Sequence, residues 1–269
     1  MNTNSLKNIV LPAIIFFIII AIWSTIAQNV QNFPTPSDTY IHAFGGEDSL
    51  GDEVEGVLSD PFYIENEDDK GIFWQVISSL ERVFAGFILA IIVGVPVGLA
   101  IGMSKNFQIA LEPYIQIFKP VSPLAWLPLL LFVFQDINAT AISTIFVTSI
   151  WPIIINTSLG VKSVSVDYMN VAKVLQFTPL EKIRKIILPV AVPYIFTGMR
   201  LSLGIAWLVI VAAEMLTGGI GIGFWIWDEY NNLNYFNIII GIIIVGLVGF
   251  LLDIIMGKIA DFFDYRKRV

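Results

Sequence analysis

The sequence predicts an all-α membrane protein with six transmembrane helices, and three observations lead to this fold class. Of the 269 residues, 56% are hydrophobic and only 14% are charged, whereas about a quarter of the residues in a soluble domain are charged. The mean hydropathy is +0.79. The apolar residues are gathered into runs of about 20, the length that a helix needs to cross the hydrocarbon core of a bilayer.

Six of these runs are predicted to be spans. Three carry no charge, at residues 9–27, 83–103 and 139–158, and two carry charges toward their ends, at 195–216 and 235–256. The remaining run, 114–134, contains Lys119 and three prolines, so we predict a bent or partly irregular span there. The first run exceeds the length of a signal-peptide core, and we expect it to be retained as a helix.

Basic residues indicate the orientation, because cytoplasmic loops of membrane proteins are enriched in Lys and Arg. With the N-terminus inside, every inner segment carries basic residues, while the outer segments carry only Lys70 and Arg82. We therefore predict that both termini are cytoplasmic. The predicted parts are a first transmembrane helix at 1–28, an acidic extracytoplasmic loop at 29–72, a transmembrane core at 73–258 and a cytoplasmic tail at 259–269.

Most of the negative charge lies in one segment. Residues 29–77 contain eleven acidic residues and one basic residue, so they contribute −10 to the net charge of −7, and the other residues contribute +3. Two interpretations stay open: a solvated, partly disordered loop, or a docking surface for an extracytoplasmic partner. His42 lies in this segment and is interpreted as a surface side chain. The acidic balance argues against nucleic acid as a partner.

The residue types argue against an enzyme. The chain has no cysteine and one histidine, which excludes disulfides, thiolate metal sites and most histidine chemistry. It contains neither the Gly-x4-Gly-Lys-Ser/Thr phosphate loop nor the Gly-x-Ser-x-Gly elbow of serine hydrolases. We therefore predict no catalytic residue, no metal site and no cofactor.

The segment 160–189, between the fourth and fifth spans, is the most informative loop. Apolar residues recur in it at helical spacing with basic residues between them, which predicts two short amphipathic helices. The break is expected at Thr178-Pro179 and the end before Pro189. Such a helix can transmit a push from a soluble partner, or it can anchor the loop to anionic lipid.

This loop resembles the EAA loop of binding-protein-dependent ABC importer permeases, whose pattern is Glu-Ala-Ala-x3-Gly followed after a gap by Leu-Pro. Here Asn170 replaces the Glu, Gln176 replaces the Gly, and Leu188-Pro189 stands at the expected offset. The resemblance implies that the loop contacts a cytoplasmic ATPase. The residues it assigns to this contact are Asp167, Tyr168, Asn170, Val171, Ala172, Lys173, Leu175, Gln176 and Phe177.

From about Asp69 onward the chain is similar to the nitrate/bicarbonate-type subfamily of these permeases. The matching segments are 69–71, 74–75, 122–126, 171–175, 188–189, 193–198, 206–207, 212–214, 221–224 and 226–228. The resemblance implies a multi-pass subunit of the inner membrane, paired with a second permease copy as a homodimer, with ATPase subunits inside and an anion-binding lipoprotein outside.

The activity that this resemblance implies is import of a small inorganic anion by alternating access. We expect nitrate or nitrite, with bicarbonate or cyanate as the alternatives. A stand-alone channel or secondary carrier is the alternative from another class. The absence of a detectable inverted repeat in the sequence argues against it.

Polar and irregular positions inside the spans are the candidates for the pathway and its gate. The prolines make the third span irregular, which places Pro123 and Trp126 beside the pathway. Glu214, next to Met215, is expected to form an outer gate held by hydrogen bonds to a neighbouring helix. Arg200 lies about 21 Å from Glu214 along a helix, where it can attract an anion or reach lipid phosphate.

Three further features carry expectations. Asp253 is expected to reach toward the membrane surface or to pair with Lys258. Gly94, Gly98 and Gly102 form a small-residue ladder that predicts a helix-packing face. The glycine-rich run 218–223 precedes an aromatic run, and the pair is either an ordinary interfacial belt or a mobile lid.

Overall fold

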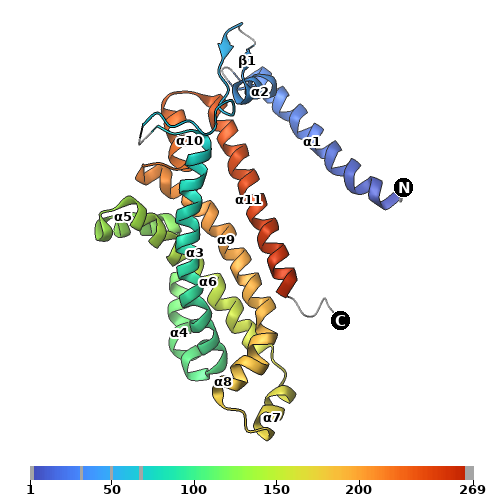
Figure 1. Cartoon of the computed structure of the whole chain (residues 1–269), viewed down its shortest axis with the longest axis vertical. Coiled ribbons are helices and arrows are strands. Elements are labelled where there is room, and N and C mark those ends of the chain that lie inside the picture. Colours follow the sequence, from blue (N-terminus) through green and yellow to red (C-terminus); the bar gives the residue numbers. More distant parts are fainter. Residues whose placement is uncertain (1–2, 31–32, 49–50, 67–68, 264–269) are drawn as a thin grey trace. The chain divides into compact units, whose positions relative to one another are not determined.

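The computed structural model (Figure 1) describes residues 3–30, 33–48, 51–66 and 69–263. The chain divides into two compact units. The first unit consists of Met1–Gln75 and Trp225–Ile244, and the second of Val76–Phe224 and Val245–Val269. The elements, in chain order, are α1 (Thr3–Asn29), α2 (Pro36–Phe44), β1 (Gly46–Glu47), β2 (Glu53–Val54), α3 (Ile72–Met103), α4 (Lys105–Phe118), α5 (Pro123–Phe134), α6 (Ile137–Lys162), α7 (Val166–Val174), α8 (Pro179–Lys182), the π-helical segment η1 (Ile183–Ile187), α9 (Leu188–Thr217), α10 (Ile222–Asn231) and α11 (Tyr235–Phe263).

The described residues contain five helices that are long and apolar enough to cross a membrane, and a sixth candidate span that is broken. The broken span consists of α4 and α5, which meet at an angle of 97°. This agrees with the bent span predicted at 114–134, although α4 already begins at Lys105. The bend follows from Pro120 and Pro123, which cannot donate the backbone hydrogen bonds of a continuous helix.

The prediction that the helical segment ends before Pro189 is wrong. The segments α8, η1 and α9 follow one another without a break, and Pro189 lies in the first turn of α9. A proline ring normally presses on the carbonyl group four residues earlier. Here the wider π turn just before it, in which the N–H of Leu188 donates to the carbonyl of Ile183, changes the hydrogen-bond pattern and accommodates the ring.

The predicted break at Thr178-Pro179 is confirmed. Thr178 caps α8 with a capping box, because its side chain accepts from the N–H of Glu181 while the Glu181 carboxylate accepts from the N–H of Thr178. The chain therefore starts a new helix at this point, and that helix continues into the fifth span.

The second unit is built on α3, α6 and α9. The predicted glycine ladder of α3 packs against α6: a Cβ atom on Gly94 would lie 2.9 Å from Ile153, and one on Gly102 would lie 2.5 Å from Val161. Helix α6 also packs against α9, and Gly198 of α9 permits this contact. A Cβ atom on Gly198 would lie 2.9 Å from the carbonyl oxygen of Pro152 in α6. Small residues thus let three helix backbones approach closely.

The first unit contains a folded part of the acidic segment. Thr35 caps α2 by accepting from the N–H of Asp38, and β1 pairs with β2 in an antiparallel ribbon. Where the structure describes it, this segment therefore has regular structure. Burial raises the pKa of Tyr63 to about 12, and the hydrogen bond that its hydroxyl donates to Asp69 adds to the rise.

The interpretation of His42 as a surface side chain is wrong. Its ring stacks on Phe236, with the ring centroids 4.0 Å apart and the planes 2° from parallel. Its Nε2 atom is buried and has no hydrogen-bond partner among the described residues. The partner aromatic lies almost 200 positions later in the chain, so no local pattern could have indicated the contact.

The glycine ladder makes a prediction about stability. Gly98→Ala would place a carbon 2.6 Å from Cβ of Thr157 and 2.8 Å from the carbonyl oxygen of Ile154. We expect the substitution to lower the free energy of unfolding by about 1–3 kcal/mol, the usual cost of overpacking. The measurement is the Tm of the purified chain in detergent.

Gly204→Ala is the matched control, because it also lies within a helix but has nothing within 4 Å of an added Cβ. Alanine favours a helix over glycine by about 1 kcal/mol, so this variant is expected to keep or raise the Tm. A Gly98→Ala protein as stable as the Gly204→Ala protein would contradict the close approach of α3 and α6.

Candidate functional site

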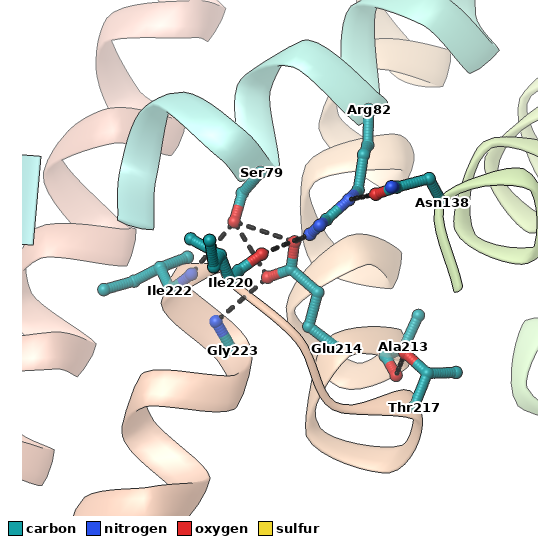
Figure 2. Close-up of polar contacts among 9 residues, drawn as sticks. All are labelled: Ser79, Arg82, Asn138, Ala213, Glu214, Thr217, Ile220, Ile222 and Gly223. Carbon is teal, nitrogen blue, oxygen red and sulfur yellow. Dashed lines mark hydrogen bonds and ion pairs between the residues drawn. The ribbon is translucent and has the colours of Figure 1, made fainter. Parts of the chain in front are cut away.

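A buried carboxylate, that of Glu214, is the centre of a polar cluster in the second unit. Glu214 lies in the last turn of α9 and is fully buried. Ser79 Oγ lies 2.9 Å and 2.8 Å from the two carboxylate oxygens, Arg82 Nη1 donates to Oε1 at 2.7 Å, and the N–H of Gly223 donates to Oε2 at 3.0 Å. Figure 2 shows these donors converging on the carboxylate from α3 and from the turn after α9.

The same cluster fixes the turn between α9 and α10. Arg82 Nη1 also donates to the carbonyl of Ile220 at 2.6 Å, and Ser79 Oγ accepts from the N–H of Ile222 at 3.0 Å. On its other side Arg82 donates from Nε to Asn138 Oδ1, at the start of α6. Three helices and one turn therefore meet at a single ion pair (Figure 2).

The glycines of this turn have separate structural reasons, and the Glu214 carboxylate is the reason at one position. A Cβ atom on Gly221 would lie 2.3 Å from the carboxyl carbon of Glu214, and one on Gly223 would lie 2.1 Å from the carbonyl oxygen of Val211. Gly218 and Gly219 have φ of +79° and +87°, which side chains disfavour. The glycine-rich run thus serves close packing here, and its role as a mobile lid stays a prediction.

The cluster is arranged as buried charges require. An isolated carboxylate in a nonpolar interior is costly, and a partner of opposite charge with further hydrogen bonds offsets that cost. The expected hydrogen bonds from Glu214 to a neighbouring helix are present, and the gate role of Glu214 stays a prediction. Ser79 and Arg82 were not predicted as site residues, although their spacing of three residues places them on one face of a helix.

Arg200 is paired, and the expected pairing of Asp253 with Lys258 is wrong. Arg200 Nε donates to Asp253 Oδ1 at 2.6 Å, and Nη2 donates to Oδ2, so the pair is bidentate and joins α9 to α11. Asp253 therefore pairs with Arg200 and not with Lys258. The positive charge of Arg200 is thus already matched.

The other pathway candidates lie in two places. Met215 is half-buried beside Glu214. Pro123 and Trp126 line a cavity of about 470 Å³ at the break between α4 and α5. The structure thus brings Pro123 and Trp126 together, but Arg200 and Met215 are not among the residues that line this cavity. Among the described residues, no group of three His, Cys, Asp or Glu side chains could hold a metal ion.

Helix α7 exposes nearly all of its surface. Its N-terminus is capped by Ser165, whose side chain accepts from the N–H of Asp167. Within α7, which the structure describes throughout, Ala172 is the one buried residue, at 1% exposure. The exposed members of the predicted contact set are Asp167, Tyr168, Asn170, Val171, Lys173, Leu175 and Gln176, and Phe177 is half-buried.

The end of α7 explains the position that glycine usually occupies in the EAA pattern. Gln176 has φ of +51°, in the left-handed region. Its N–H donates to the carbonyl of Lys173, and the N–H of Phe177 donates to the carbonyl of Ala172, which together form a Schellman motif. The chain therefore makes the turn that glycine favours with a glutamine instead, so the replacement leaves the turn in place.

The family model described as "Binding-protein-dependent transport system inner membrane component" matches residues 80–269. The nitrate import permease protein NrtB of Leptolyngbya laminosa is 43% identical over 96% of this chain and 88% of that protein. The bicarbonate transport system permease protein CmpB of Synechocystis sp. is 48% identical over 73% of this chain and 71% of that protein.

The fold is also found among solved structures. A chain of the MetNI methionine ABC transporter, in an inward-facing conformation, matches with a TM-score of 0.62 at 16% identity, covering 71% of this chain and 95% of that chain. At this level of identity the likeness concerns the fold alone. It agrees with the helical membrane architecture predicted from the sequence.

The buried ion pair predicts non-additive stability. Arg82→Met removes the cation and leaves the Glu214 charge buried, which is expected to lower the free energy of unfolding by about 3–5 kcal/mol. In the double variant Arg82→Met/Glu214→Met no buried charge is left unpaired, so it is expected to be more stable than the single Arg82 variant. The measurement is thermal unfolding of each protein in detergent. Strictly additive losses would show that the two charges do not stabilise one another.

Proposed function

Because the chain belongs to the family of binding-protein-dependent transport system inner membrane components, we propose that it is the permease subunit of an ATP-driven importer whose cargo is nitrate or nitrite. The observation that carries the proposal is the similarity to a nitrate import permease over nearly the whole chain. Bicarbonate is the second candidate, since bicarbonate permeases are comparably similar over a shorter part. Cyanate is a third candidate on the sequence resemblance alone.

The proposed partners follow from the family and from the shape of α7. An ATPase subunit is proposed to bind the exposed side of α7, where Tyr168, Val171 and Leu175 are each more than half exposed. Apolar side chains in this number on one short helix favour a protein contact. A substrate-binding lipoprotein on the outer side, a second copy of the permease and the surrounding lipid complete the proposed assembly.

The proposed orientation keeps both termini in the cytoplasm. It places residues 29–72 outside and the coupling loop 160–189 inside, with the transmembrane core at 73–258 and the tail at 259–269. The asymmetric distribution of Lys and Arg supports it. In this orientation α7 faces the compartment that contains ATP, as coupling to an ATPase requires.

Uptake measurements test the cargo. The complete transporter, purified with its ATPase and binding protein and placed in proteoliposomes, is expected to take up labelled nitrate only when ATP is supplied. Unlabelled nitrite is expected to compete more strongly than bicarbonate or cyanate. ATP-dependent uptake of bicarbonate without nitrate uptake would overturn the nitrate assignment and favour the second candidate, and nitrate transport by this chain alone would favour a channel or carrier.

The coupling role of α7 predicts an effect of charge on its exposed side. Val171→Asp is expected to lower ATP-dependent uptake at least tenfold, because a carboxylate would be buried unpaired against the ATPase. Leu180→Asp is the matched control: Leu180 is also exposed and apolar, but it lies in α8 outside the predicted contact set. The measurements are co-purification of the ATPase and nitrate uptake. Full uptake by the Val171→Asp protein would contradict the proposed contact.

A further inference from the structure

Two cavities lie next to each other along α4 and α6. The first, of about 470 Å³, is lined by Lys119, Ser122, Trp126 and Trp151 among others. The second, of about 210 Å³, includes Gln108, Gln116 and Lys162 in its lining. Lys119 and Ile155 line both, so the two spaces adjoin at these residues. Together they follow α4 and α6 from the break in the third span to the last turn of α6.

Lys119 differs from the paired charges of this unit. Arg82 pairs with Glu214 and Arg200 pairs with Asp253, whereas no described acidic side chain lies within ion-pair distance of Lys119. Lys119 lies at the break between the two halves of a candidate membrane span. Lys119 is exposed in the single chain and lines both cavities, and ionisable residues within membrane spans commonly mark substrate or ion pathways.

The wall around Lys119 suits an anion. No Asp or Glu lines the first cavity, and the two tryptophans present indole N–H groups, which donate and cannot accept. The Ser122 hydroxyl forms no cap hydrogen bond with α5. The rest of the wall is largely apolar and includes Val121, Leu201 and Ile205. One cation with a few neutral donors in an apolar wall favours a singly charged, weakly hydrated anion over a divalent one.

The second cavity continues this lining with amides and one more cation. It contains one acidic residue, Glu112, whose carboxylate accepts a hydrogen bond from Gln108 at 3.0 Å. Lys162, in the last turn of α6, also lines it. The positive charges thus lie at the junction of the two cavities and at the end of α6, and the one carboxylate of the second cavity is bonded to an amide of its own helix, α4.

We propose that Lys119 binds the transported anion at the junction of these two cavities, and that the site takes a small monovalent oxyanion such as nitrate. The proposal rests on the proposed importer function and adds the residue and the route to it. Trp126 is the second anion contact, through its indole N–H. A lipid phosphate shares the chemistry of a free oxyanion, and the experiment distinguishes these two sources.

The test uses the complete transporter in proteoliposomes. Lys119→Gln is expected to lower nitrate uptake at least tenfold, while assembly with the ATPase and basal ATP hydrolysis stay at the wild-type level. Lys119→Arg keeps the charge and is expected to restore a substantial part of the uptake. Lys105→Gln removes a cation from the same helix but outside both cavities, and it is expected to transport like wild type. Trp126→Phe keeps the ring, loses the N–H donor and is expected to raise the KM for nitrate several-fold.

Wild-type uptake by the Lys119→Gln protein would overturn the proposal. Loss of assembly and basal ATP hydrolysis in both Lys119 variants would also overturn it, because the residue would then have a structural role.

Uptake in vesicles of neutral glycolipid separates the two anion sources. If the effect of Lys119→Gln disappears without phospholipid, Lys119 binds lipid phosphate and the proposal is overturned. If the wild-type transporter takes up bicarbonate and not nitrate, the proposed nitrate cargo is wrong. The role of Lys119 is then tested separately, by comparing bicarbonate uptake of the wild-type and Lys119→Gln proteins.

Discussion

The buried carboxylate of Glu214 is the constraint on which the described membrane core depends. Neither lipid nor apolar side chains can compensate a charge there, so hydrogen-bond donors must come from polar groups of the protein. Ser79 and Arg82 supply them from α3, and the backbone of Gly223 supplies another. Because the backbone of the turn lies directly on the carboxylate, position 221 has no room for a side chain and is glycine. One ionisable residue thus determines the partner face of a helix and one position of a loop.

The described membrane core combines three closely packed helices, α3, α6 and α9, with one irregular segment, α4 and α5. Glycines let α3, α6 and α9 approach so closely that a single added methyl group would clash. The pair α4 and α5, bent by 97°, has two cavities along its course instead. Irregular backbone within a membrane is stable only where protein or water surrounds it, so the prolines and the cavities beside them belong together physically. Lys119, which has no ion-pair partner among the described residues, lines both cavities. The contact between α6 and α9 is closely packed, so it needs no such cavity.

What could be predicted from the sequence was governed by local patterns. Apolar run lengths gave the spans, prolines gave the bent one, and glycine spacing gave the packing face of α3. The pairings of Glu214 with Arg82, of Arg200 with Asp253 and of His42 with Phe236 join residues far apart in the chain, and one sequence does not show which distant residues meet. The error at Pro189 has another origin: the rule that proline ends a helix is sound, but a π turn can absorb the ring.

The charges of the chain can be reconciled with an anionic cargo once their partners are known. A net charge of −7 on a permease that is proposed to carry an anion is surprising only if the charges are treated as one sum. The acidic excess belongs to the segment 29–77, the carboxylate of Glu214 is matched by Arg82, and that of Asp253 is matched by Arg200. A matched pair has a field that falls off steeply, whereas a single unmatched cation in an apolar wall acts over a longer distance. Lys119 is the one charged residue in the described lining of the first cavity, so the charge nearest to that space is positive whatever the total, which agrees with the proposed anion.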